Sequence, residues 1–422
     1  MVKFVKEKLF RRVKRCRACL GKNLIRVMDL GSTPAANAFL KRVDKKTTSR
    51  ERWFPLKALF CKHCGLVQLE HVVDARYLFK NYVYVSSISP ANLAHFKSFA
   101  ELAVKRFNLK PKTLVVDIGS NDGILLKPFA SLGMKILGVE PATNIARRAI
   151  ADGVPTLARF FNPEVARFIR RREKRGATII TAANVFAHVD DLDELIEGVK
   201  ILLKDEGVFI IEAPYVVDLL TKNTFDLIYH EHLSHLGVRP LTVLFERLGM
   251  KIFDVEHNDS HGGSIRVFVK KTAANHRVRP TVARFLQKEK QLGLQRVLTY
   301  RKFAKRILAN KLNLLKLLKK LKKEGKTIAG YGAAAKSTTL LHYFGIDNKI
   351  VDYVVDDSPY KQDLFTPGTH LPVVPPQRIY TDRPDYLLLL TWNFAEPIMK
   401  QHRRFRKLGG KFIVPVPQPK IV

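Results

Sequence analysis

The sequence predicts an α/β protein that combines two strand–helix domains with a small cysteine-bearing module. Apolar strand-like runs alternate with helical patterns between residues 81 and 272, which is typical of a mostly parallel sheet covered by helices. A second strand–turn–helix starts near residue 326, and all four cysteines precede residue 80. We therefore expect a cysteine module at 1–80, a central domain at 81–272, a helical linker at 273–325 and a C-terminal domain at 326–422.

The composition indicates a globular protein in a reducing compartment. Apolar residues make up 46% of the chain and charged residues 27%. No run of about eighteen apolar residues predicts a membrane span. Residues 1–15 are basic but lack the apolar stretch of a secretory signal, so we expect a cytoplasmic protein. Lys and Arg outnumber Asp and Glu by 74 to 38 without forming a compact nucleic-acid footprint. This excess could decorate solvated faces or attract a diphosphate-bearing substrate.

The first functional pattern is a pair of CxxC knuckles, Cys16–Cys19 and Cys61–Cys64. Two residues between the cysteines let both thiolates of a knuckle face one tetrahedral ion. Every cysteine of the chain belongs to a knuckle, so the sequence predicts a structural zinc site with four sulfur ligands. Four thiolates leave no open position for a substrate, which argues against catalytic zinc. The alternative is four unliganded thiols.

The expected strands and helices follow from apolar runs and apolar periodicity. A basic amphipathic stretch at 280–323 predicts one or two helices, with apolar positions that include Leu298, Phe303, Ile307, Leu312, Leu315 and Leu318. The strand candidates are Thr113–Ile118, Lys135–Glu140, Ala177–Ala182, Gly207–Glu212, Lys251–Val255, Ser264–Val269, Ile350–Val355 and Tyr386–Thr391.

The first of these strands ends in a glycine turn, Asp117-Ile-Gly-Ser-Asn-Asp-Gly123, that leads into a helix. Glycines let the backbone pass close to a ligand, and the helix start offers free N–H groups. The second strand ends in Glu140, a carboxylate suited to a ribose diol. Dinucleotide-binding enzymes share this glycine turn and the carboxylate at the end of the second strand. The spacing of Gly119 and Gly123 around Asn121 and Asp122, followed by Glu140-Pro-Ala, favours S-adenosylmethionine.

Groups able to move protons follow the later strands. Asn184 and His188 come directly after the third candidate strand, where the methionine end of the cofactor should lie, because ligands sit at the carboxyl ends of parallel strands. The segment Tyr229-His-Glu-His232 can supply a general base and a group that orients it. Taken alone, it could also be a metal site or a solvated polar run. A zinc protease motif is excluded, because its histidines lie four residues apart around a Glu.

Taken together, the segments resemble the NDP-sugar C-methyltransferases, typified by C3-methyltransferases of deoxysugar biosynthesis. The resemblance covers nearly the whole chain, and the order of the motifs is more specific than any one of them. It is carried by the four cysteines and by Tyr82–Ser87, Asp117–Gly123, Asn184–His188, Tyr229–His232, His261–Arg266, Gly330–Lys336 and Pro367–Pro372.

The resemblance implies a zinc module, a Rossmann-like S-adenosylmethionine-dependent methyltransferase domain and a C-terminal Rossmann-like domain, with a sugar nucleotide in the cleft between the large domains. The implied substrate is a nucleoside-diphospho-4-keto-deoxyhexose, methylated at C3 through an enolate. A monomer or homodimer that needs neither nucleic acid nor membrane is expected. The cofactor would be bound by Asp117, Gly119, Asn121, Asp122, Gly123, Glu140 and Asn184.

By the same resemblance, His232 takes the C3 proton and Glu231 holds or polarises its surroundings. The keto oxygen or the enolate would be bound by Tyr229, His188 and one of Tyr82 and Tyr84. Substrate contacts are expected from Tyr82, His261 and Lys336. The turn Gly332–Lys336 either receives the diphosphate or is a tight strand–helix junction, and Ser337 follows where a glycine would also fit.

Two other functions remain as alternatives. The net charge and the zinc knuckles are compatible with an RNA or DNA methyltransferase, which would need a dense basic face. A non-catalytic zinc adaptor would have lost the cofactor loop or the proton-moving residues, whereas Gly119, Gly123, Glu140 and His232 are all present.

Overall fold

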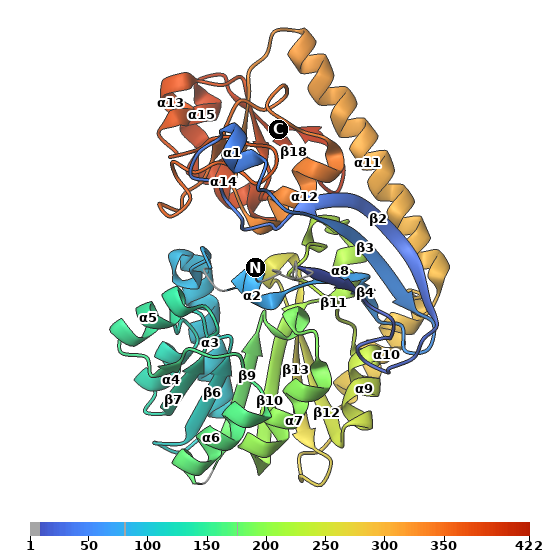
Figure 1. The fold of residues 1–422 in the computed structure, drawn as a ribbon, viewed down its shortest axis with the longest axis vertical. Helices are drawn as coiled ribbons and strands as arrows, with labels where there is room; N and C mark the ends of the chain where they lie inside the picture. The colour runs from blue at the N-terminus through green and yellow to red at the C-terminus, as the bar shows by residue number, and fades with distance from the viewer. Residues whose placement is uncertain (1–8, 80–81, 175) are drawn as a thin grey trace, which may run out of the picture.

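The computed structural model describes residues 9–79, 82–174 and 176–422. A central seven-stranded sheet occupies the lower half of Figure 1 and a six-stranded C-terminal sheet the upper half. The long strands β2 and β3 run along the side that joins the two halves (Figure 1). The arrangement confirms the predicted α/β class.

The central sheet has the strand order β12-β13-β10-β9-β6-β7-β8. The strands from β10 to β8 are parallel, whereas β13 is antiparallel to both of its neighbours. All six predicted strands of this region are present, and the carboxyl ends of the parallel ones share one edge. The bounds are β6 Leu114–Ile118, β7 Lys135–Val139, β8 Thr156–Leu157, β9 Ala177–Ala183, β10 Leu203–Pro214, β12 Met250–Asn258 and β13 Ser264–Lys271.

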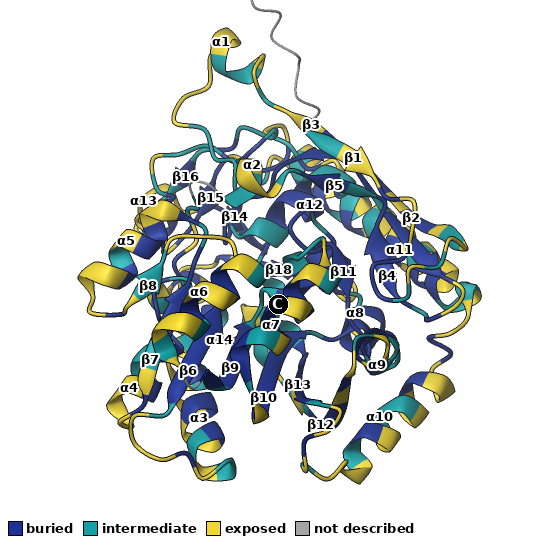
Figure 2. Ribbon diagram, turned by 60° about the horizontal axis from the view of Figure 1, so that its bottom comes forward, coloured by how far each residue is buried: buried dark blue, intermediate teal, exposed yellow. Residues whose placement is uncertain are grey.

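Amphipathic helices cover the faces of the central sheet, and their buried stripes face inward (Figure 2). Helix α6 is an example: Asn162 caps its first turn, Pro163 begins it, and Val165, Ala166 and Ile169 are buried. The helices of this region are α3 Pro90–Arg106, α4 Leu126–Ser131, α5 Thr143–Ala151, α6 Pro163–Glu173, α7 Leu192–Leu202, α8 Val216–Thr221 and α9 Val238–Arg247.

The N-terminal cysteine module shares a sheet with the central region. Its four-stranded antiparallel sheet has the order β11-β4-β3-β2, and β11 (Ser234–His235) comes from the chain directly after the Tyr229–His232 segment. Sequence reasoning did not predict this strand. The remaining elements are β1 Phe10–Arg12, paired with β5 His71–Val73, and β2 Leu24–Pro34, α1 Lys45–Thr48, β3 Trp53–Cys61, β4 Val67–Leu69 and α2 Ala75–Phe79.

The C-terminal sheet has the order β16-β15-β14-β17-β18-β19 and is parallel except for β19. The predicted strand Ile350–Val355 is wrong in length: only β15 (Val354–Val355) is a strand, because the N–H groups of Ile350 and Val351 both turn back to the carbonyl of Asp347. The other bounds are β14 Ile328–Tyr331, α12 Ala335–Phe344, β16 Val373–Val374, α13 Arg378–Asp382, β17 Tyr386–Leu389, α14 Ala395–Gln401, α15 Arg403–Lys407, β18 Lys411–Val414 and β19 Lys420–Ile421.

Two helices, α10 (Pro280–Gln291) and α11 (Val297–Lys323), connect the central and C-terminal sheets. Helix α11 runs along the outside of β2 (Figure 1) and buries Phe303, Ile307 and Leu318, as the apolar spacing predicts. The apolar side chains of Leu298 and Leu312 point to solvent instead, since they lie off that stripe. In the described part of the chain, no helix is long and apolar enough to cross a bilayer.

Candidate active site

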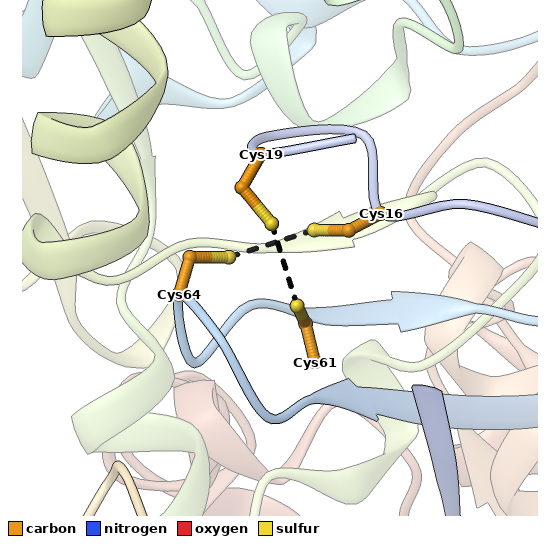
Figure 3. Close-up of side chains that lie close together, drawn as sticks. All are labelled: Cys16, Cys19, Cys61 and Cys64. Atoms are coloured by element: carbon orange, nitrogen blue, oxygen red, sulfur yellow. Dashed lines mark hydrogen bonds between the residues drawn. The ribbon is translucent and has the colours of Figure 1, made fainter. Parts of the chain in front are cut away.

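The four cysteines converge on one point (Figure 3). Cys16 and Cys64 lie 3.5 Å apart between their Sγ atoms, as do Cys19 and Cys61, and all four Sγ atoms lie within 4.8 Å of one another. An ion about 2.3 Å from each of four tetrahedral sulfurs would place the sulfurs about 3.8 Å apart. The donor set and its spacing therefore fit a structural zinc ion.

The glycine turn after β6 forms a cradle with unpaired acceptors. A Cβ at Gly119 would lie 2.2 Å from Val185 Cγ2, and one at Gly123 would lie 2.7 Å from Val154 Cγ2, so both positions require glycine. Asp122 is buried, and neither of its carboxylate oxygens has a hydrogen-bond partner in the described residues. A buried carboxylate without donors is costly. It therefore marks a place where a ligand with donor groups fits.

Glu140 closes the same turn from the end of β7. Its two carboxylate oxygens accept the backbone N–H groups of Asn121, at 2.9 Å, and Ala142, at 2.8 Å. Burial raises the pKa of Glu140, although both hydrogen bonds oppose that shift. Each oxygen keeps a second lone pair, which suits the two hydroxyls of a ribose. Glu140 thus fits the role predicted for it.

Two further cofactor candidates hold the turn rather than face outward. Asp117 accepts the hydroxyl of Thr181 at 2.6 Å, and burial raises its pKa to about 7. The Asn121 side chain accepts the Ser86 N–H at 3.0 Å and donates to the Tyr84 carbonyl at 3.2 Å. Asn121 therefore fastens the Tyr82–Ser87 segment over the turn. Asn184 has a positive φ of 58° after β9, and its side-chain oxygen is buried without a partner among the described residues.

Tyr229 and His232 form a hydrogen-bonded pair. The Nδ1 atom of His232 lies 2.8 Å from the carbonyl of Leu227, which can only accept, so Nδ1 carries the proton. The lone pair of Nε2 is then free to accept the Tyr229 hydroxyl at 2.8 Å. Burial lowers the pKa of His232 well below the usual value of 6.5. The imidazole is therefore neutral at physiological pH, as a general base requires.

His188 lies beside this pair, with its ring centre 5.0 Å from that of His232. It belongs to the 3₁₀ turn η2 (Phe186–His188) directly after β9 and stacks on Phe79 at 5.8 Å. Burial lowers the pKa of His188 to about 4. The structure thus brings the three predicted site residues Tyr229, His188 and His232 together.

Glu231 and Tyr82 form a second pair next to the first. Glu231 accepts the Tyr82 hydroxyl at 2.6 Å and the Asn37 side-chain amide at 2.7 Å, and burial raises its pKa to about 7. Sequence reasoning missed Asn37, which follows β2 in the cysteine module. Tyr84 is more exposed and receives a hydrogen bond from Asn92 at 3.2 Å, so it lies at the margin of the cluster.

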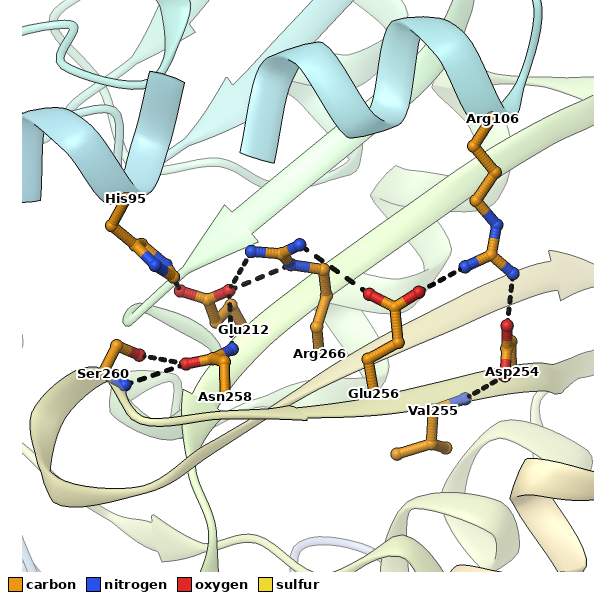
Figure 4. A network of polar contacts seen from close by, with 9 residues as sticks. All are labelled: His95, Arg106, Glu212, Asp254, Val255, Glu256, Asn258, Ser260 and Arg266. Carbon is orange, nitrogen blue, oxygen red and sulfur yellow. Dashed lines mark hydrogen bonds and ion pairs between the residues drawn. The ribbon is translucent and has the colours of Figure 1, made fainter. Parts of the chain in front are cut away.

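An ionic network surrounds Glu212 near the end of β10 (Figure 4). Glu212, at the end of β10, accepts two hydrogen bonds from Arg266, at 3.0 and 2.7 Å, and one from His95 at 2.5 Å. Burial would raise the pKa of Glu212, but His95 and Arg266 together lower it. Asn258 also donates to Glu212 and accepts from Ser260, which fixes the turn that carries His261. Sequence reasoning missed His95.

Lys336 lies at the boundary between the central and C-terminal sheets. Its Nζ donates to Asn393 and sits 4.8 Å from the ring centre of Trp392, whose Nε1–H donates to Asp226 at 2.8 Å. Burial lowers the pKa of Lys336 to about 8, although Asp226 opposes the shift. His261 belongs to the turn η4 (Ser260–Gly262), which faces Asn393. The predicted substrate contacts Lys336 and His261 therefore lie on the two sides of this boundary.

The turn Gly332–Lys336 is filled by the chain's own groups. The Ala333 N–H donates to Asp356 at 2.7 Å, and Lys361 lies 3.7 Å from the same carboxylate while donating to the Ala333 carbonyl at 2.9 Å. This geometry favours the strand–helix junction over a diphosphate site at Ala333. Lys336 itself points away from that turn, toward Trp392 and Asn393.

Three family models and one curated relative together match nearly the whole chain. Family models match residues 16–79 ("Putative zinc binding domain"), 93–255 ("Methyltransferase domain") and 259–417 ("C-methyltransferase C-terminal domain"). The C-methyltransferase NovU of Streptomyces niveus is 37% identical over 414 residues, which cover 98% of each chain. A ubiquinone biosynthesis O-methyltransferase of Rhodopseudomonas palustris is 27% identical over 132 residues, 29% of this chain and 50% of that protein.

Solved structures resemble only part of the chain. Magnesium protoporphyrin IX methyltransferase (ChlM) from Synechocystis PCC 6803 with bound SAH has a TM-score of 0.33 and 15% identity, over 42% of this chain and 81% of that one. The PH0226 protein from Pyrococcus horikoshii OT3 has a TM-score of 0.35 and 13% identity, over 46% and 97%.

Proposed function

The chain belongs to the S-adenosylmethionine-dependent C-methyltransferases, and on that premise we propose that it methylates C3 of a nucleoside-diphospho-4-keto-deoxyhexose. The observation that carries the proposal is the Tyr229–His232 pair, a neutral buried base with His188 beside it. A carbon next to a ketone is acidic enough for such a base, because the enolate spreads its charge onto the carbonyl oxygen.

The first step is the removal of the C3 proton. The Leu227 carbonyl holds the Nδ1–H of His232, so Nε2 is the atom that takes the proton. Tyr229 donates to Nε2 in the structure, and its hydroxyl must turn toward the substrate as the proton arrives. The electron pair of the broken C–H bond forms a π bond between C3 and C4, and the π pair of the C4 carbonyl moves onto the keto oxygen.

The second requirement is stabilisation of that oxygen. The candidates to bind the keto oxygen are Tyr229, His188, which lies beside His232, and Tyr82, which is bonded to Glu231. Tyr84 lies farther out, next to Tyr82. Glu231 does not hydrogen-bond to the His232 side chain; its carboxylate accepts the Tyr82 hydroxyl, which commits the single proton of Tyr82 to Glu231. Tyr82 donates to the enolate only when Glu231 is protonated, which its pKa of about 7 allows near neutral pH. Preorganised donors of this kind act where charge develops in the transition state.

The cofactors of the chain are S-adenosylmethionine and a structural zinc ion held by Cys16, Cys19, Cys61 and Cys64. When bound, S-adenosylmethionine supplies an electrophilic methyl group on a sulfonium. Asp122 and Glu140 offer it carboxylate acceptors, and Gly119 and Gly123 let the backbone approach. The protein's remaining task is to hold C3 in line with that methyl group.

We place the sugar nucleotide at the boundary lined by His261, Lys336 and Trp392, between the domains 81–272 and 326–422. The zinc module 1–80 and the helices of 273–325 flank these domains. In this proposal the enzyme is a cytoplasmic monomer or homodimer that uses no nucleic acid. The observation that favours a nucleic-acid substrate instead is the net charge of +36.

One experiment separates the two substrates. The zinc-loaded protein is incubated with methyl-labelled S-adenosylmethionine and a panel of nucleotide 4-keto-deoxysugars, with an RNA mixture as a second acceptor. We expect mass spectrometry to find the label on a sugar and NMR to place it on C3. Label on RNA and on no sugar would overturn the proposal and favour the nucleic-acid substrate. Label on a sugar oxygen would contradict carbon methylation.

A further inference from the structure

The first zinc knuckle reaches into the central region through one side chain, Arg17. Its Nε donates to Asp190 at 3.1 Å, and its Nη1 donates to the Leu233 carbonyl at 3.2 Å and the Leu69 carbonyl at 3.4 Å. Arg17 lies between two metal-binding cysteines and is only 6% exposed. A buried guanidinium that binds three separate segments fixes their spacing.

The two central segments held by Arg17 are those that carry the paired histidines. Leu233 is the residue directly after His232, and Asp190 lies two residues after His188. The rings of these histidines are 5.0 Å apart. One guanidinium thus bonds to the chain next to each ring.

The knuckle that carries Arg17 is itself held in place. The Arg17 backbone N–H donates to the Gln68 side chain at 2.8 Å, and the Gln68 side chain donates in turn to the Arg15 carbonyl at 3.1 Å. Strand β4, three residues beyond Cys64, pairs with β11, and the Leu69 N–H donates to the Leu233 carbonyl at 2.9 Å. The chain directly after His232 is therefore held by Arg17 of the first knuckle and by strand β4, which follows the second knuckle.

We propose that Arg17 is a positioning residue for methyl transfer, through which the zinc knuckle sets the separation of His188 and His232. This inference rests on the proposed function only for the role of His232 as the base. It gives the zinc module a part in the reaction without any contact between the metal and the substrate. A displacement of about 1 Å at a reacting group can cost about 100-fold in rate.

The test compares four variants of the full, zinc-loaded chain. Arg17→Met removes all three side-chain bonds, and Arg17→Lys can restore one of them. Asp190→Asn leaves the bond to Leu233 intact and is a milder second variant should Arg17→Met fold poorly. Arg11→Met is the matched control, because exposed Arg11 also pairs with Asp190 but does not reach Leu233.

Hydrogen exchange measured by mass spectrometry is the readout that needs no substrate. In Arg17→Met we expect faster exchange in segments 186–190 and 229–235, unchanged exchange in 114–124, and one zinc per chain. We expect kcat to fall about 10- to 100-fold with KM and cofactor affinity within about threefold. Arg17→Lys should recover part of kcat, and Arg11→Met should match the wild type.

The outcomes distinguish the two proposals. Unchanged exchange in both histidine segments, or a normal kcat in Arg17→Met, overturns the positioning role. Loss of zinc together with faster exchange throughout residues 9–79 would show a merely structural role and would also overturn it. If the exchange result is as expected but the wild type methylates no sugar nucleotide, the proposed substrate fails while the positioning of the two histidine segments stands.

Discussion

His232 illustrates how a single contact decides the chemistry of a residue. Its Nδ1–H is committed to the Leu227 carbonyl, so the basic atom is Nε2, and burial keeps the ring neutral. We expect His232→Gln to lower kcat by about 10²- to 10⁴-fold, the range of general base catalysis. Calorimetry should find cofactor affinity unchanged within about twofold. An equal loss of cofactor affinity would contradict the role of base. His230→Gln is not a suitable control, because His230 hydrogen-bonds to the Phe54 carbonyl of the zinc module.

A second residue-scale prediction concerns the charge of Lys336. Because burial lowers its pKa to about 8, Lys336 loses its charge as the pH rises through 8, and a diphosphate ligand should bind less tightly there. We expect affinity for the sugar nucleotide to fall about 5- to 10-fold between pH 7 and pH 9.5, measured by calorimetry at constant ionic strength. Lys336→Arg should stay charged and bind without this pH dependence. A wild-type affinity that does not change with pH would show that Lys336 does not face the phosphates. The control is Lys349→Arg, at an exposed position, which should keep the wild-type pH dependence.

At the scale of elements, the two knuckles and the strands that follow them form one unit with β11. Removal of one sulfur ligand therefore should affect both the metal and the segment after His232. We expect Cys61→Ser to bind less than one zinc per chain and to lower Tm by more than about 5 °C, since structural zinc contributes folding energy directly. Atomic absorption and calorimetry would measure both. Lys62→Ser, exposed within the same knuckle, should retain the metal and the wild-type Tm. Full zinc content in Cys61→Ser would mean that the site has other ligands.

Elements also explain which parts of the structure could be predicted. Strands such as β6 and β9 are buried on both faces and read as continuous apolar runs, so the sequence reveals them. A two-residue strand has no periodicity: β11 exists because Val67 and Gln68 supply its partner. The same limit applies to the site. His188 was predictable because it follows a parallel strand, whereas Asn37 meets Glu231 across 194 residues of sequence, and His95 lies on a helix.

At the scale of the whole molecule, the C-terminal region docks on the segment that leads to the Tyr229–His232 pair. The Thr339 hydroxyl donates to the Ile228 carbonyl at 3.1 Å, and the rings of Phe225 and Phe344 stack with centres 5.0 Å apart. The Trp392–Asp226 bond lies on the same segment. The C-terminal region and Tyr229 therefore share contacts through residues 225–228, and we expect a change at this boundary to alter the position of Tyr229 beside His232.

The tryptophans of the chain allow this coupling to be tested with a matched pair. Trp392→Phe keeps an aromatic ring beside Lys336 but removes the donor to Asp226, leaving a buried carboxylate without that partner. The loss weakens docking of the C-terminal region on residues 225–228, where a hydrogen bond to a charged group contributes about 1.5–3 kcal/mol. Because the proposed sugar-nucleotide site lies at this boundary, we expect KM to rise, by at most the roughly 10- to 100-fold change that corresponds to this energy. Trp53→Phe is the control, because Trp53 is 47% exposed and contacts only the His342 ring among the aromatic residues described. In the Trp53→Phe variant Trp392 is the single tryptophan of the chain, and we expect the Trp392 fluorescence to change when the sugar nucleotide binds. Two results together would contradict this placement: a wild-type KM in Trp392→Phe, and Trp392 emission in the Trp53→Phe protein that does not change when the substrate is added. The sugar nucleotide would then not bind at this boundary, and the coupling of the two regions would have no role in recognising it.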